Sequence, residues 1–549
     1  MYHSVHGSGW NHVEFGLDEC AFGQLVLTRV VVVTVDAPLA EPGLLSGLSR
    51  DLADAGFSVD GVAGFLGEGA YAALNREQFI PALAIAEAAQ GPTATLIRFF
   101  LLALPASAAE LDEALPRTRA AGLQSLGLAA VESGAWRSLV DLRPYAFTDQ
   151  DGEVQLHVAS DLGAHQRPGA LRHDHVLGIG QASLTLAQST IRTPVEKALD
   201  LGTGCGIQTF HLLRHARHVT ATDISPRALA FTEFNLLLNA DALRIDPANP
   251  GGRVTLRQGS LLGPVRGERF DLAVSNPPFV ITPRHRGESA EDQYTYRDGG
   301  LAGDEIVSSL VRGLPGVLAP GGRAQLLGNW EVHSGDAAWH ERLASWFDGE
   351  CWVIQREQLG PEHYAETWLQ DASQGRDAES YAAAYRDYLG DFAERGVDSV
   401  GFGMIWLRAP QPAAGLPQPG AGLRRFEEIG HPIEQPVGST LAAAVERFDW
   451  LAGHDLPAAK LVVAEDVTEE RHQRPGAEHP GVILLRQGAG LRRTTLLSSE
   501  LAGFVSACDG TLTVAQIIAA LEALLAVELA LLDPVRELLL DGFLLPEPQ

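Results

Sequence analysis

Apolar and polar positions follow two alternating periods along the middle of the chain. Five short apolar runs that end in turn residues have the pattern of strands: 197–201, 219–222, 254–257, 270–275 and 323–327. Segments with apolar residues at helical spacing, 207–215 and 226–239, separate the first three runs. Strands that alternate with helices are typical of a parallel sheet with crossover helices. We therefore expect an α/β core with a mostly parallel sheet.

The same region closes with two further strand-like runs, 351–355 and 400–407. Between them lies a helical run, 381–395, inside a stretch that breaks the alternation. We expect the α/β core over residues 150–408, with an insertion at 357–396 over one edge of the sheet.

The region before the core, residues 37–149, is predominantly helical. Its apolar residues recur at helical spacing over 44–55, 70–89, 94–104 and 108–121, and residues 123–143 then turn β-like. Helices followed by a small hairpin indicate a winged-helix-like substrate domain. Such a domain binds either nucleic acid or protein, and the acidic chain favours a protein-contact or packing role. Residues 1–36 are expected to be an N-terminal extension.

Residues 409–422 are mostly Pro, Gly, Ala and Gln and are expected to be a linker. Residues 423–549 then form a second unit, with a strand-like run at 482–486 and helices expected near 498–508, 514–525 and 531–540. Thr513 is placed to cap the second of these helices. We expect a C-terminal α+β winged-helix-like domain.

Composition narrows the class of protein. A chain of 549 residues is long enough to form several hydrophobic cores. Its net charge of −28 opposes broad, non-specific binding to the phosphates of nucleic acids. No apolar run approaches the roughly 20 residues of a membrane span. Cysteines are too far apart for a disulfide framework or a zinc site, and the histidines 211, 215 and 218 are expected on the surface. We expect a cytoplasmic protein without metal.

A glycine-rich turn follows the first core strand. Gly202, Gly204 and Gly206 are spaced G-x-G-x-G, and Asp223 lies 21 residues after Gly202 at the end of the next strand. Glycines let a ligand approach backbone N–H groups closely, and a carboxylate at Asp223 can accept both hydroxyls of a ribose. The G-x-G-x-x-G spacing of dinucleotide enzymes is not met, because residue 207 is Ile.

The fourth core strand ends in Ser275-Asn276-Pro277-Pro278-Phe279. The Asn276 side-chain oxygen and the Pro277 backbone carbonyl can accept hydrogen bonds from an NH₂ group whose lone pair is delocalised. These two hydrogen bonds would hold the nitrogen in place and stabilise the positive charge that develops on it while a group is transferred to it. Phe279 offers an apolar face for stacking a planar group. The tetrapeptide therefore predicts chemistry at an amino or amide nitrogen, with Asn276, Pro277 and Phe279 as the catalytic set.

The stretch from Asp200 through Asp223 to Phe279 resembles the class I S-adenosylmethionine-dependent methyltransferases, which have a Rossmann-like core. The resemblance implies that S-adenosylmethionine is the cofactor, with Asp200 at its methionine end, Asp223 at its ribose and Ser260 at its adenine. Many members have an acidic residue where this chain has Ser260. The upstream segment 178–185 would close over the methionine moiety.

Asn276-Pro277-Pro278-Phe279 resembles the motif of the small-domain N-methyltransferases, which act on bases of RNA and DNA or on protein glutamine. A base amine in ribosomal or transfer RNA is our first expectation, and the N5 amide of a protein glutamine is the alternative. A third possibility is a non-catalytic scaffold that binds the cofactor; the intact tetrapeptide argues against it. Arg284, His285, Arg286 and Arg297 either meet a phosphate or carboxylate at the pocket mouth or belong to a solvated loop.

Overall fold

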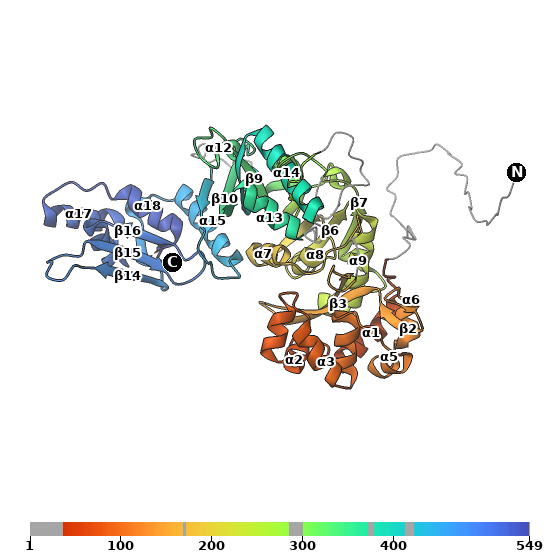
Figure 1. Ribbon diagram of the computed structural model, residues 1–549. Helices are drawn as coiled ribbons and strands as arrows, with labels where there is room; N and C mark the ends of the chain where they lie inside the picture. The colour runs from red at the N-terminus through yellow and green to blue at the C-terminus, as the bar shows by residue number, and fades with distance from the viewer. Residues whose placement is uncertain (1–36, 168–171, 285–299, 372–377, 412–421, 548–549) are drawn as a thin grey trace, which may run out of the picture. The chain divides into compact units, whose positions relative to one another are not determined.

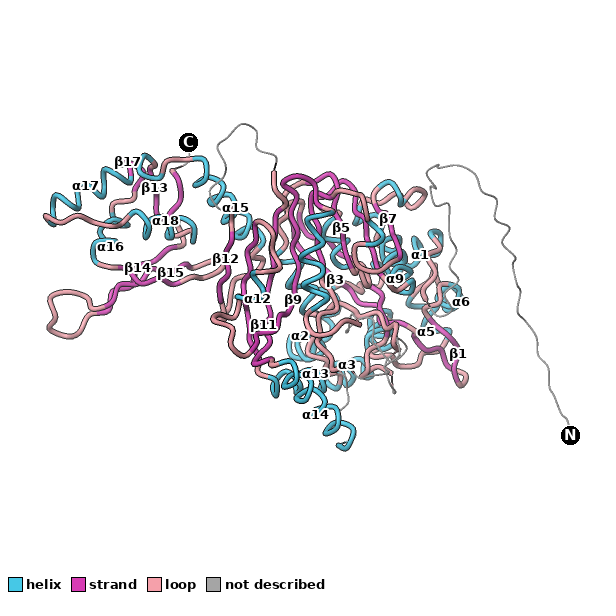
Figure 2. The backbone as a smooth tube through the Cα atoms, turned by 90° about the horizontal axis from the view of Figure 1, so that it is seen from above, coloured by secondary structure: helices cyan, strands magenta, loops and turns pink. Residues whose placement is uncertain are grey.

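A computed structural model describes residues 37–167, 172–284, 300–371, 378–411 and 422–547. Its centre is a sheet in which eight described strands follow the order β12-β10-β11-β9-β8-β5-β6-β7. Figure 2 shows β12, β11, β9, β5 and β7 of this sheet side by side. The strands are β5 (Val195–Leu201), β6 (Ala216–Asp223), β7 (Val254–Gln258), β8 (Phe270–Ser275), β9 (Leu318–His333), β10 (Glu350–Leu359), β11 (Val397–Arg408) and β12 (Arg424–Glu428).

The sheet is mostly parallel, as the strand–helix alternation predicts. β5, β6, β7, β8 and β9 pair in parallel, and β11 alone is antiparallel to both of its neighbours. β11 follows β10 after two helices and returns antiparallel beside it, which makes this edge of the sheet mixed. The expected Rossmann-like fold class is confirmed.

Helices cover both faces of the sheet, and neighbouring residues of one strand belong to different apolar clusters. In β5, Ala198 packs in the cluster that contains α7 (Gln181–Ser189), α8 (Ile207–Leu212) and α9 (Pro226–Leu238), whereas Leu199 packs in the cluster that contains α11 (Glu305–Gly313). Figure 1 shows α7, α8 and α9 in a row. Successive side chains of a strand point to opposite faces, so the core sits as two layers.

The N-terminal region is helical as expected, and its helices are joined to the core by a long hairpin. The hairpin strands β3 (Val140–Asp149) and β4 (Gly152–Asp161) pair along their full length, so the expected boundary at residue 149 falls in their turn. The other elements are α1 (Pro42–Asp54), α2 (Val59–Leu74), α3 (Ile80–Ala88), α4 (Pro92–Leu96), the π-helix Ile97–Leu101, α5 (Ala108–Ala114), α6 (Arg119–Ser125), β1 (Ala129–Glu132) and β2 (Ala135–Ser138).

Two details of the N-terminal expectation are wrong. The run 70–89 is not one helix: α2 ends at Leu74, and Glu77 adopts a positive φ of 59° before α3 begins. The β-like stretch from residue 123 starts inside α6 and reaches its first strand only at Ala129. The winged-helix comparison for this region stays a prediction.

The C-terminal region begins by extending the core sheet. β12 pairs in parallel with β10, although residues 423–549 are expected to be a separate unit. α15 (Gly438–Gly453) follows, and the remaining elements enclose an apolar cluster of their own. They are β13 (Lys460–Val463), β14 (Val467–His472), β15 (Val482–Gln487), β16 (Thr494–Leu497), α16 (Ser499–Ser506), β17 (Asp509–Thr513), α17 (Val514–Leu525), α18 (Leu532–Asp541) and β18 (Leu544–Pro546).

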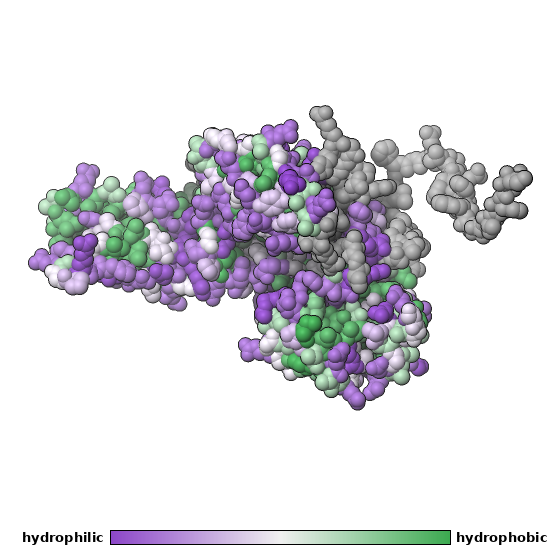
Figure 3. All heavy atoms as spheres, viewed as in Figure 1, coloured by the Kyte–Doolittle hydropathy of each residue, from purple (hydrophilic) through white to green (hydrophobic). Residues whose placement is uncertain are grey.

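The predicted cap of α17 is confirmed. The Thr513 side chain accepts from the Gln516 N–H, and the Gln516 side chain accepts from the Thr513 N–H, which forms a capping box. Leu524 and Leu525 at the far end of this helix are exposed, and Figure 3 shows apolar atoms over that region.

The insertion between β10 and β11 consists of α13 (Pro361–Asp371) and α14 (Ala378–Arg395), and the second contains the run expected to be helical. Both helices pack on β11 around Tyr364, Tyr388 and Phe392. No described helix is long and apolar enough to cross a membrane.

Candidate active site

The glycine turn after β5 depends on backbone conformations that favour glycine. Gly202, Gly204 and Gly206 have φ values of 77°, 57° and 100°. A Cβ on Gly206 would lie 2.9 Å from the Phe210 ring, whereas a Cβ on Gly202 or Gly204 would meet nothing within 4 Å. The turn therefore packs tightly at its end and leaves open space beside its first two glycines, where a ligand can approach the backbone.

Hydrogen bonds hold this turn to the neighbouring strand and helix. The Thr222 carbonyl on β6 accepts from the N–H groups of Gly202 at 2.9 Å and Thr203 at 3.0 Å. On α9, Thr232 donates to the Gly204 carbonyl at 2.8 Å, and the Asn235 amide donates to the Cys205 carbonyl at 2.9 Å. The turn is thus rigid before any ligand binds.

Asp200, the last acid of β5, is fully buried beneath the turn. Its Oδ2 accepts from the hydroxyls of Thr203 at 2.8 Å and Thr209 at 2.6 Å, while Oδ1 has no hydrogen-bond partner in the part of the chain that the structure describes. Burial raises the pKa of Asp200 to about 6, against the lowering effect of the two threonines. A buried carboxylate oxygen without a donor suits a cationic or N–H group of a ligand.

Asp223 lies at the end of β6, as predicted, with its carboxylate fixed by backbone donors. Oδ2 accepts from the Gly204 N–H at 3.0 Å and Oδ1 from the Ser225 N–H at 2.9 Å. Burial raises its pKa, although these backbone bonds act in the opposite direction. Each carboxylate oxygen keeps a second lone pair, so Asp223 can still accept two hydroxyl donors.

Ser260 follows β7 and is exposed, one residue after Gly259, whose N–H donates to the Asp223 carbonyl at 2.9 Å. Ser260 lines a cavity of about 420 Å³ together with Leu262 and Gly313. Neither the glycine turn nor Asp223 lines that cavity. The predicted adenine contact at Ser260 therefore stays a prediction.

The Asn276 turn follows β8 at the same edge of the sheet. Ser275 pairs with Leu201 across the parallel strands, so Asn276 and Gly202 leave the sheet side by side. The Asn276 Oδ1 atom is buried and has no hydrogen-bond partner among the described residues. Pro277 is buried, and Phe279 is half-buried against both apolar clusters. The structure thus brings the two predicted halves of the site together.

The segment predicted to close over a ligand is less defined. Residue Gly180 caps α7 without a side-chain bond, and the Gln208 amide on α8 donates to the Ser183 carbonyl at 2.8 Å. This places the start of α7 beside the helix that follows the glycine turn. Its role stays a prediction.

The predicted cationic mouth of the pocket is described only at Arg284, whose guanidinium donates to the Leu301 carbonyl at 2.9 Å. His285, Arg286 and Arg297 lie outside the described residues.

His211 is not on the surface, which corrects the expectation. It is buried under the β3–β4 hairpin, where its Nε2 lies 2.7 Å from the Tyr145 hydroxyl and its Nδ1 accepts from Arg192 at 3.1 Å. Burial, with help from the Arg192 charge, lowers the pKa of His211 to about 3. No cluster of three potential metal ligands occurs among the described residues.

Four residues that the sequence analysis does not single out bond within or near the site: Thr203, Thr209, Ser275 and Tyr364. The first three lie within or beside the two motifs, so their position there was an available signal. Tyr364 lies more than 80 residues after the Asn276 turn, and its sequence context carries no signal.

Comparisons with known proteins match separate parts of the chain. Residues 165–292 match the family model described as methyltransferase small domain, and residues 54–139 match a domain of unknown function. A release factor glutamine methyltransferase of Moorella thermoacetica is 40% identical over 129 residues, which are 22% of this chain and 42% of the relative. A ribosomal protein uL3 glutamine methyltransferase of Bradyrhizobium diazoefficiens is 32% identical over 163 residues, 28% of this chain and 46% of the relative.

The chain spans less than half the length of these two curated relatives. Among solved structures, a 16S rRNA N2 G1207 methyltransferase of T. thermophilus covers 46% of this chain and 60% of its own, with 17% identity and a TM-score of 0.24. That likeness is too weak to support an argument. The matched residues 165–292 contain both the glycine turn and the Asn276 turn.

Proposed function

Residues 165–292 belong to the methyltransferase small-domain family, of the class I S-adenosylmethionine-dependent type, and on this premise we propose that the chain methylates the side-chain amide nitrogen of a protein glutamine. The observation that carries the proposal is the buried Oδ1 of Asn276 at the carboxyl edge of β8, which has no hydrogen-bond partner within the described part of the chain. The glutamine enzymes among its relatives support the choice of acceptor.

The Asn276 oxygen is suited to an acceptor that presents N–H groups. A buried acceptor without a donor is costly, and a glutamine NH₂ group would supply one hydrogen to Asn276 and one to the Pro277 carbonyl. The two prolines restrict the backbone, so that the carbonyl direction is set in advance. Both acceptors would stabilise the positive charge that grows on the nitrogen during transfer. Phe279 would pack against the amide plane.

The cofactor residues fit S-adenosylmethionine. The open space beside Gly202 and Gly204 admits a ligand to the backbone. The buried Oδ1 of Asp200, to which no described residue donates, suits an ammonium group at the methionine end. Asp223 would accept the two ribose hydroxyls, Gly206 would shape the turn, and Ser260 would lie at the adenine. When bound, S-adenosylmethionine supplies a methyl group on a positively charged sulfur.

Protein glutamine is favoured over the RNA base that is the first expectation from sequence. The named relatives act on a release factor and on a ribosomal protein, and the net charge of −28 opposes a broad grip on phosphates. The matched segment, residues 165–292, leaves out most of the regions on either side of it. We propose that those flanking regions select the protein acceptor.

In the test, the chain is incubated with tritiated S-adenosylmethionine and a lysate of a strain that lacks the chain, and transfer of labelled methyl to the lysate is measured. We expect label that survives RNase, is lost on protease digestion, and is released as N5-methylglutamine. Label that RNase removes would assign the enzyme to RNA. Binding of S-adenosylmethionine in a calorimetric titration without transfer to any lysate component would instead support the scaffold.

A further inference from the structure

The α13–α14 insertion contacts the chain directly after the Asn276 turn. Ile281, two residues after Phe279, is buried in an apolar cluster with Leu369 of α13 and Phe392 of α14. A segment that interrupts the sheet alternation therefore packs against the chain just after the predicted transfer site, although Tyr364 and Ile281 lie 83 residues apart in sequence.

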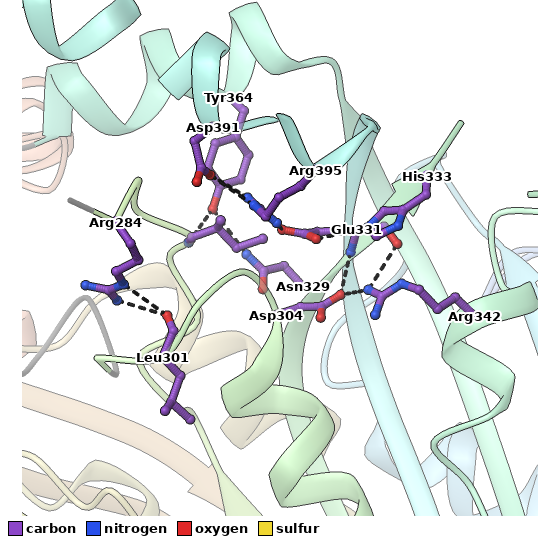
Figure 4. A network of polar contacts seen from close by, with 11 residues as sticks. Arg284, Leu301, Asp304, Asn329, Glu331, His333, Arg342, Tyr364, Asp391 and Arg395 are labelled. Atoms are coloured by element: carbon purple, nitrogen blue, oxygen red, sulfur yellow. Dashed lines mark hydrogen bonds and ion pairs between the residues drawn. The ribbon is translucent and has the colours of Figure 1, made fainter. Parts of the chain in front are cut away.

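Tyr364 on α13 makes the polar part of this contact. Its hydroxyl accepts from the Ile281 N–H at 2.8 Å and from the Asn329 amide on β9 at 3.2 Å (Figure 4). Its ring is fully buried and stacks on Phe402 of β11, with 5.8 Å between ring centroids. The hydroxyl is thus a fixed point between α13, β9 and the segment that follows Phe279.

The other helix of the insertion is also tied to β9. Arg395 of α14 pairs with Glu331 and, at 2.6 Å, with Asp391. Glu331 in turn donates its backbone N–H to Asp304 at 2.8 Å, and Arg342 also pairs with Asp304 (Figure 4). These buried and half-buried charges hold α14, the second helix of the insertion, against the sheet.

We propose that Tyr364 is a positioning residue for methyl transfer, which sets the Asn276–Phe279 turn through its hydrogen bond to Ile281. This inference rests on the proposed function. Pro277 and Pro278 fix φ at two of the four positions between Asn276 and Ile281, which limits how much of a backbone shift at Ile281 this short segment can absorb. Reacting groups need placement within a fraction of an ångström, so a loosened turn lowers the rate without changing how S-adenosylmethionine binds.

The test compares the full chain with Tyr364→Phe, which keeps the ring and removes the hydroxyl. We expect the transfer rate to lysate protein at saturating S-adenosylmethionine to fall on the order of tenfold. The KM for S-adenosylmethionine should stay within about twofold, because the Tyr364 hydroxyl bonds to Ile281 and Asn329, which lie outside the glycine turn. Tyr385→Phe is the matched control: this tyrosine of α14 is only half-buried and its hydroxyl has only weak contacts, 3.3–3.4 Å long, with Glu366 and Glu362.

Hydrogen–deuterium exchange of the peptide 276–284 gives a readout that does not need activity. The Ile281 amide should exchange faster in Tyr364→Phe and at the wild-type rate in Tyr385→Phe. If Tyr364→Phe does not fold, Asn329→Ala removes a second hydrogen-bond donor to the Tyr364 hydroxyl and should raise exchange to a smaller extent.

The outcomes separate the two claims. A wild-type chain without transfer overturns the proposed function, while exchange still decides the role of Tyr364. A wild-type chain that transfers methyl groups, alongside a Tyr364→Phe variant with unchanged rate or unchanged exchange, overturns the positioning role.

Discussion

The Ser275 hydroxyl donates a hydrogen bond of 2.8 Å to the Leu201 carbonyl. The two residues end neighbouring parallel strands, one directly before Gly202 and the other directly before Asn276. This bond therefore adds to the parallel pairing of β5 and β8 at the edge where the predicted cofactor turn and the predicted acceptor turn leave the sheet.

Replacing Ser275 with Ala should destabilise the chain by about 1 kcal/mol, because a buried hydrogen bond is lost and a carbonyl loses a donor. Urea-induced unfolding would measure the change. Ser345→Ala is the control, since Ser345 also donates to a backbone carbonyl but is exposed. Equal unfolding midpoints for the two variants would mean that the bond contributes nothing to the core.

Replacing Asp223 with Asn should weaken binding of S-adenosylmethionine by roughly 10- to 100-fold, the effect of losing hydrogen bonds to a charged group. In the wild type the Gly204 N–H donates to the Asp223 carboxylate. In Asp223→Asn the side-chain NH₂ group can lie opposite this N–H, where neither group can accept a hydrogen bond. Isothermal titration measures the dissociation constant. Asp241→Asn on the exposed surface of α10 (Ala240–Leu243) should bind as the wild type does. Unchanged affinity in Asp223→Asn would remove this residue from the cofactor site.

His211 predicts a pH dependence of stability. Its pKa is about 3 in the folded chain and about 6.5 when unfolded, so the unfolded state binds more protons between these values. Its contribution is complete above about pH 6.5 and is lost as the pH falls toward 3. The wild type should lose more unfolding free energy than His211→Gln between pH 7 and pH 4. Parallel stability profiles of the two proteins would contradict this account.

Local patterns were sufficient to predict the core and the two turns. A strand that ends at Gly202 and a strand that ends at Asn276 each carry their own signal of period and turn residues, and parallel pairing then requires both ends to lie at one edge. The sequence therefore predicts the strands and turns that form the candidate site, although not the contacts between their side chains.

Contacts between distant segments could not be predicted in the same way. β12 joins the sheet through pairing of Arg424 with Cys351, and the hairpin β3–β4 buries His211. Tyr364 reaches Ile281 only because the insertion folds back over β11. Each depends on tertiary packing between segments far apart in sequence, which no local period records.

The most direct test of the account is methyl transfer by Asn276→Ala, measured with its affinity for S-adenosylmethionine. The Asn276 Oδ1 atom is buried, and no described residue, including those of the glycine turn, donates a hydrogen bond to it. We expect nearly unchanged affinity for S-adenosylmethionine and a transfer rate to protein glutamine at least ~100-fold lower, the usual effect of removing a group that stabilises the transition state. Near-normal transfer by this variant would contradict the assignment of Asn276 as the residue that holds the acceptor nitrogen.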